Sequence, residues 1–84
     1  MYDLVFDDKA ISFMNKLSKS VKSRIFSKLL LSKANPLHYF ERLSGRKDYK
    51  LRAGNYRAIA DIDSINRKIQ VTLVGHRRNV YKRD

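Results

Sequence analysis

The stretch from residue 49 to residue 57 constrains the fold of this chain more than any other. Within it, apolar residues alternate with Lys50 and Arg52. That period of two is typical of a strand with one packed face and one cationic face. Residues 53–55 (Ala-Gly-Asn) then predict a tight turn, because Gly and Asn tolerate positive φ at low cost. The sequence therefore predicts a β-hairpin whose second strand begins with Tyr56 and Arg57.

The hairpin gathers the three cations Lys50, Arg52 and Arg57. Like charges held together repel one another, so a polyanion is the natural partner of this surface. The whole chain has the same bias, with 19 Lys and Arg against 8 Asp and Glu and a net charge of +11. This balance favours a nucleic acid as the partner. An acidic membrane surface and an acidic protein are the other two candidates.

Length and composition exclude several classes of protein. The 84 residues predict a single domain, 1–84, with a modest core. There is no cysteine, which excludes disulfides, thiol nucleophiles and zinc–thiolate sites and agrees with a reducing cytosol. The acidic N-terminal residues predict that there is no signal peptide. The longest unbroken apolar run is three residues, as at Leu29–Leu31, so no membrane-spanning helix is expected. We therefore expect a cytoplasmic protein with no membrane partner.

The N-terminal half predicts a short strand and two helices. Residues 2–6 are expected to form the strand, and apolar residues at i, i+3, i+4 and i+7 from Ala10 predict an amphipathic helix. A second helix is expected at about 20–33, with Phe26 and Leu30 buried beside its central apolar stripe. Pro36 ends it, because proline cannot continue a helix.

The C-terminal half predicts a connector at 37–47 and strands at about 48–53, 55–63 and 67–76. The predicted fold is therefore α+β in the order β-α-α-β-β-β. The N-terminal helical hairpin is expected to pack on one face of a small antiparallel sheet, which leaves the other face for binding.

Four motifs in this order and spacing resemble the RelE family of the RelE/ParE toxin superfamily, and the resemblance extends over nearly the whole chain. They are Phe-Glu-Arg-Leu-Ser-Gly at 40–45, the hairpin at 49–57, Val-Gly-His-Arg at 74–77 and Val-Tyr at 80–81. The resemblance implies a RelE-like fold and the toxin component of a type II toxin–antitoxin pair. Such a toxin enters the ribosomal A site, cleaves messenger RNA (mRNA) there and is neutralised by a RelB-like antitoxin.

The implied chemistry is metal-independent transesterification without a cofactor, in which the ribose 2′-OH attacks the adjacent phosphate. RNA supplies the nucleophile, so the protein provides a base, cations and aid for the leaving group. By resemblance, Lys50 is the general base, and Arg57 and Arg77 bind the phosphate and stabilise the transition state. Tyr81 matches a tyrosine that stacks on or orients the substrate. The RNA-binding residues are expected to be Arg52, His76, Arg78, Arg46 and Lys47.

Other interpretations stay open. Without the resemblance, the hairpin cations would more often be a solvated face of a sheet than a catalytic set. Asp61 and Asp63 place two carboxylates on one strand face, and such a pair more often serves salt bridges or a turn than Mg²⁺. Two other functions fit a chain of this kind: a ParE-like inhibitor of DNA gyrase, and a non-enzymatic basic RNA-binding module.

Overall fold

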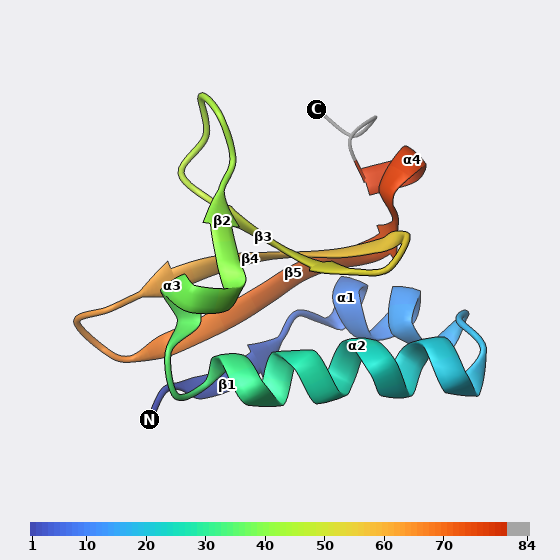
Figure 1. Ribbon diagram of the computed structural model, residues 1–84, viewed down its shortest axis with the longest axis horizontal. Coiled ribbons are helices and arrows are strands. Elements are labelled where there is room, and N and C mark those ends of the chain that lie inside the picture. The colour runs from blue at the N-terminus through green and yellow to red at the C-terminus, as the bar shows by residue number, and fades with distance from the viewer. Residues whose placement is uncertain (81–84) are drawn as a thin grey trace.

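Five strands form one sheet, and the two longest helices lie together on one side of it (Figure 1). This computed structural model describes residues 1–80. The elements in chain order are β1 (Asp3–Phe6), α1 (Asp8–Asn15), α2 (Lys19–Ser32), α3 (Pro36–Tyr39), β2 (Phe40–Arg42), β3 (Tyr49–Ala53), β4 (Tyr56–Asp63), β5 (Lys68–His76) and α4 (Arg77–Val80). None of the helices in this part of the chain is both long and apolar enough to cross a bilayer.

The strand order is β1-β5-β4-β3-β2. The pairs β2–β3, β3–β4 and β4–β5 are antiparallel. In contrast, β1 runs parallel to β5, with Leu4 opposite Ile69. The predicted α+β fold, with its helical hairpin after the first strand, is confirmed. The sheet is mixed rather than antiparallel throughout: α1 and α2 carry the chain from β1 at one edge to β2 at the opposite edge, and β1 pairs in parallel with the last strand, β5.

Local signals set the helix boundaries. Ser18 caps α2, since its side chain accepts a hydrogen bond from the backbone N–H of Val21 at 3.4 Å. Pro36 is in the first turn of α3, where its missing N–H costs nothing. The helix expected at about 20–33 is observed at Lys19–Ser32, so the apolar period and the caps located it correctly.

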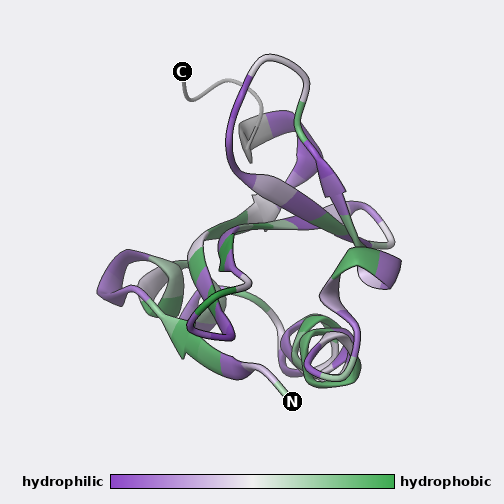
Figure 2. Cartoon of the chain, turned by 90° about the vertical axis from the view of Figure 1, so that its left-hand side faces the viewer, coloured by the Kyte–Doolittle hydropathy of each residue, from purple (hydrophilic) through white to green (hydrophobic). Residues whose placement is uncertain are grey.

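The main core lies between the helices and the sheet. Ile25 and Leu29 of α2 are buried there against Leu51, Ile69 and other apolar residues of the strands. The prediction that Phe26 and Leu30 are buried is wrong: they are 42% and 45% exposed. Apolar residues lie nearly all round α2, which is seen end-on in Figure 2, and only one side of a helix faces the sheet.

The connector expected at 37–47 contains α3 and the edge strand β2. Phe40 anchors this segment in the main core opposite Leu51. Leu43 packs with Ile59 and Leu73 in a second, smaller cluster. Residues 43–48 then form a loop that rises from the sheet on the side away from α1 and α2 (Figure 1).

Candidate functional site: a cationic hollow on the open face of the sheet

The turn between β3 and β4 organises the site. Gly54 and Asn55 connect Ala53 to Tyr56, and Gly54 has a φ of +62°, a conformation that glycine adopts without strain. In this hairpin, Arg52 lies directly opposite Arg57. The predicted hairpin is therefore confirmed. Its register places two like charges directly opposite each other, an arrangement that destabilises a sheet.

The same turn also holds the end of β5. The backbone N–H of Arg77 donates to the carbonyl oxygen of Asn55 at 2.9 Å. This bond joins the start of α4 to the hairpin, although the two segments are more than twenty residues apart in the chain. The basic segment that follows β5 is thus placed beside Arg57 rather than extending away from the sheet.

Five cations from three segments line one open hollow of about 460 Å³. We call it the cationic hollow; its residues are Lys50, Arg52, Arg57, Arg77 and Arg78. It lies on the face opposite the helices, because Leu51 and Ala53 of β3 enter the main core while Lys50 and Arg52 alternate with them. Within residues 1–80, no acidic side chain lines it.

Arg57 is the unusual member of this group, since its side chain is only 6% exposed. Its Nη1 donates to the carbonyl oxygens of Gly54 and Tyr56, both at 2.9 Å. Its Nε is buried and has no hydrogen-bond partner in the described part of the chain. A buried guanidinium without a carboxylate is costly, and an orphaned donor of this kind points to an anionic ligand that the site is built to receive.

The hollow is supported from the helix side. Lys28 of α2 reaches the sheet and donates to the carbonyl oxygen of Arg52 at 2.6 Å. On the other flank of β3, Lys50 is half-buried and lies opposite Glu41 of β2 in the strand register. These placements fix the backbone of β3, from which Lys50 and Arg52 extend.

Other residues predicted for the site lie elsewhere. His76 does not line the hollow: its ring meets that of Tyr56 edge-on at 5.4 Å, and its Nδ1 accepts from the backbone N–H of Arg78 at 3.3 Å. Tyr81 lies outside the described residues.

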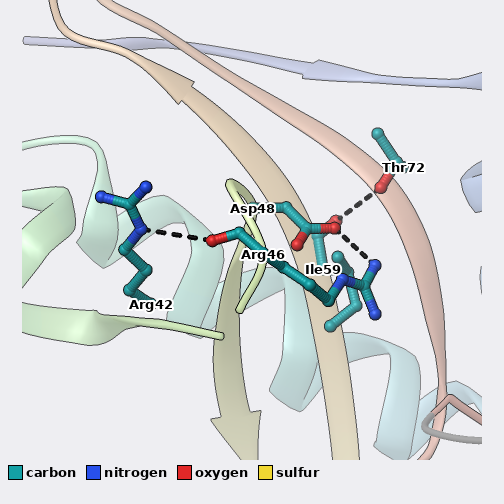
Figure 3. A network of polar contacts seen from close by, with 5 residues as sticks. All are labelled: Arg42, Arg46, Asp48, Ile59 and Thr72. Carbon is teal, nitrogen blue, oxygen red and sulfur yellow. Dashed lines mark hydrogen bonds and ion pairs between the residues drawn. The ribbon is translucent and has the colours of Figure 1, made fainter. Parts of the chain in front are cut away.

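Arg46 and Lys47 are in the raised loop between β2 and β3, not in the hollow. Arg46 forms an ion pair with Asp48 at 2.7 Å, and its carbonyl oxygen accepts from Nε of Arg42 at 3.3 Å (Figure 3). Nearby in the same view, Thr72 of β5 donates to the carbonyl oxygen of Ile59. The loop is therefore held by its own contacts, with Lys47 exposed near its end.

The turn interpretation of Asp63 is confirmed. Its carboxylate accepts hydrogen bonds from the backbone of Ile65 and from both the backbone and the side chain of Asn66. The bond from the Asn66 backbone is the main cause that lowers the pKa of Asp63 below its ordinary value. Among the described residues, no group of three or more His, Cys, Asp and Glu side chains is placed to hold a metal ion.

Sequence reasoning missed two contributors to the site. The carbonyl oxygens of Gly54 and Asn55 hold Arg57 and Arg77, and Lys28 supports β3 from the other layer. The Gly-Asn pair predicted the turn, but nothing in the sequence shows which N–H groups donate hydrogen bonds to its carbonyl oxygens. Nothing in the sequence distinguishes Lys28 from the other cations of its helix.

The chain is similar to solved structures of RelE toxins. It matches the isolated E. coli RelE toxin with a TM-score of 0.76 and 26% identity, over 98% of this chain and 93% of that one. It matches RelE in the intact E. coli RelBE toxin–antitoxin complex with a TM-score of 0.78 and 28% identity, over 90% of this chain and 96% of the RelE chain. A Mycobacterium tuberculosis RelBE complex matches in fold, with a TM-score of 0.81 at 22% identity, over 90% and 98%.

No protein-family model matches the chain, and no curated protein sequence matches it either. The structural matches nevertheless extend over nine-tenths or more of this chain and of each matched chain. The predicted resemblance is confirmed at the level of the fold: this chain has the fold of the RelE toxins.

Proposed function

We propose that this chain is the toxin of a type II toxin–antitoxin pair and acts as a ribosome-dependent endoribonuclease. It would cleave mRNA in the ribosomal A site, in the cytoplasm, and a RelB-like antitoxin would neutralise it. Several of the matched structures are RelE–RelB complexes, which supports an antitoxin as the partner. The activity rests on the site rather than on the fold, because one fold supports many functions.

The observation that carries the proposal is the cationic hollow. Lys50, Arg57 and Arg77 come from three different segments and line one open space. A hollow lined by five cations attracts a phosphate group, and the orphaned Nε of Arg57 offers it a donor that is already desolvated. Donors that are fixed before the substrate arrives stabilise developing charge most effectively.

The reaction needs only groups that the hollow and the RNA contain. Lys50 takes the proton of the ribose 2′-OH while the 2′-oxygen attacks the adjacent phosphorus. The bond from phosphorus to O5′ breaks, and O5′ takes a proton from solvent water, while Lys50 later returns its proton to solvent. The products are a 2′,3′-cyclic phosphate and a 5′-hydroxyl end. Arg57 and Arg77 stabilise the charge on the pentavalent phosphorane, since arginine keeps its proton and gives it up poorly to a leaving group.

Ribosomes programmed with a short, end-labelled message test this proposal directly. The wild-type protein is expected to cleave within the A-site codon and to leave a 5′-hydroxyl on the downstream fragment. Lys50→Ala and Arg77→Ala are each expected to slow single-turnover cleavage by about 10²-fold or more. Lys68→Ala is the matched control, because Lys68 is exposed at the start of β5 and does not line the hollow.

Two outcomes would replace the proposal. An intact message together with inhibited DNA supercoiling would assign the chain to the gyrase-inhibiting toxins of the same superfamily. An intact message, normal supercoiling and salt-sensitive RNA binding would leave a basic RNA-binding module. Cleavage that persists unchanged in both Lys50→Ala and Arg77→Ala would show that the hollow is not the catalytic site.

A further inference from the structure

One turn of the chain holds both arginines that the proposed function assigns to the transition state. We call this turn, residues 53–56, the hairpin tip. Its Gly54 carbonyl oxygen accepts a hydrogen bond from Nη1 of Arg57 at 2.9 Å. Its Asn55 carbonyl oxygen accepts one from the backbone N–H of Arg77, also at 2.9 Å. The two arginines belong to different segments, so their spacing depends on the hairpin tip, and whatever fixes the tip fixes both of them.

The sheet supports the hairpin tip on one side only. Strand β2 pairs with β3 no further than Leu51. Beyond that point, Arg52 and Ala53 are paired with β4 alone among the described strands. The end of β3 therefore lies at an open edge of the sheet, and its backbone there needs a hydrogen-bond partner that is not a strand.

Helix α2 provides that partner from the layer beneath the sheet, on the side opposite α4 (Figure 1). Nζ of Lys28 donates to the carbonyl oxygen of Arg52 at 2.6 Å. The lysine is half-buried, and a hydrogen bond from a charged donor is about twice as strong as one between neutral groups. One helical turn earlier, Nη1 of Arg24 lies 3.2 Å from the point that a Cβ on Gly54 would occupy. Two cations of α2 thus approach the hairpin tip from behind.

This arrangement gives Lys28 a role different from that of the cations on the open face. Lys28 is not one of the five residues that line the cationic hollow, so it is not placed to bind phosphate itself. We propose that Lys28 is a positioning residue for the cleavage reaction. Its ammonium group holds the hairpin tip against α2 and so keeps Arg57 and Arg77 at one spacing. The proposal rests on the proposed function for the reaction that this spacing serves.

Replacing Lys28 by methionine tests this role, because methionine keeps an unbranched apolar side chain but donates no hydrogen bond. Single-turnover cleavage at saturating concentrations of programmed ribosomes is expected to slow by about 10- to 100-fold, since a displacement of about 1 Å at a catalytic group has an effect of that size. The concentration that gives half the maximal rate is expected to stay within about twofold of the wild-type value, because no contact with the substrate is lost. Lys28→Arg, which keeps a charged donor, is expected to restore most of the rate.

The matched control is Lys22→Met. Lys22 is also a lysine of α2 that donates to another element, in this case to Oδ1 of Asn15 in α1 at 2.9 Å. Its hydrogen bond does not involve the hairpin tip, so the control is expected to cleave as fast as the wild type. Rates are compared at a temperature at which urea unfolding shows every variant to be folded, which removes any effect of stability alone. Equal slowing in Lys22→Met and Lys28→Met would overturn the proposal.

A second measurement does not depend on cleavage. Hydrogen exchange followed by NMR reports on the bond from the backbone N–H of Arg77 to Asn55, because that bond protects the amide from exchange. Lys28→Met is expected to speed exchange at Arg77, and Lys28→Arg and Lys22→Met are expected to leave it at the wild-type rate. A wild-type protein that cleaves no message would refute the proposed function, and the exchange rates would still decide whether Lys28 holds the hairpin tip. Unchanged exchange in Lys28→Met, or cleavage by Lys28→Arg as slow as by Lys28→Met, would overturn the positioning role.

Discussion

Replacing Arg57 by methionine tests whether this residue is present for function rather than for stability. Methionine is unbranched and apolar, so it fills the same buried space without the charge. The variant loses two hydrogen bonds, from Nη1 to the carbonyl oxygens of Gly54 and Tyr56. Each such bond from a charged donor contributes about 1.5 kcal/mol.

The same change removes two unfavourable features. The buried Nε without a partner costs about 1–3 kcal/mol, and that cost disappears with the guanidinium. The repulsion from Arg52, directly opposite across the hairpin, disappears as well. These effects nearly offset the lost hydrogen bonds. We therefore expect the free energy of unfolding of Arg57→Met to lie within about 1 kcal/mol of the wild-type value.

Activity is expected to respond very differently. Removing one preorganised donor from a site that stabilises developing charge slows the chemical step by about 10²–10³-fold. Urea unfolding followed by circular dichroism gives the first quantity, and single-turnover cleavage on programmed ribosomes gives the second. Adding salt to about 1 M, where the Debye length is about 3 Å, should stabilise the wild type more than the variant, because only the wild type retains the crowded charge.

Two results would refute this reasoning. A loss of more than about 3 kcal/mol would mean that Arg57 is a structural residue whose partners the folded protein depends on. Undiminished cleavage in a folded Arg57→Met variant would mean that the phosphate does not contact this guanidinium.

Three further predictions concern the scaffold. Gly54→Ala is expected to destabilise the fold by about 1 kcal/mol and to slow cleavage, because an L-residue is strained at a φ of +62° and its Cβ would lie 3.2 Å from Nη1 of Arg24. Urea unfolding measures the first effect and the cleavage assay the second. Unchanged values in both would contradict the prediction. Phe40→Ala is expected to cost about 3 kcal/mol or more, since the ring is 4% exposed in the main core and anchors β2, and a smaller loss in urea would show that the edge strand holds without it. Asp63→Ala is expected to lower the melting temperature at neutral pH. The pKa of Asp63 is lowered in the fold, so its carboxylate stabilises the wild type fully at pH values above its ordinary pKa of 3.8. This stabilisation is lost as the pH falls through the pKa of the folded state. A difference in melting temperature between wild type and variant that stays constant down to pH 2 would contradict the assignment.

The sequence was most informative where one residue type has one conformational role. The alternation at 49–53 and the Gly-Asn pair predicted the hairpin, and it stands at those residues. Pro36 correctly marked the end of α2. Three cations of the site were predicted together because two strands joined by a tight turn must place Lys50, Arg52 and Arg57 near one another.

Prediction failed where the outcome depends on long-range contacts. The direction of β1 next to β5 follows from the path of the whole chain, and no local pattern contains it. The three-residue strand β2 was hidden in the connector because three residues are too few to show a period. No local pattern shows on which side of the sheet His76 lies, because Gly75 interrupts the alternation of β5; in the structure its ring contacts that of Tyr56.

The parallel pairing of β1 with β5 has a consequence for the order of events during synthesis. The first strand that the ribosome makes has no neighbour in the sheet until the last strand has emerged. The hydrogen bond from Arg77 to Asn55, which assembles the cationic hollow, forms only after that. Under the proposed function, a nascent chain therefore has no assembled site until β5 and Arg77 have emerged.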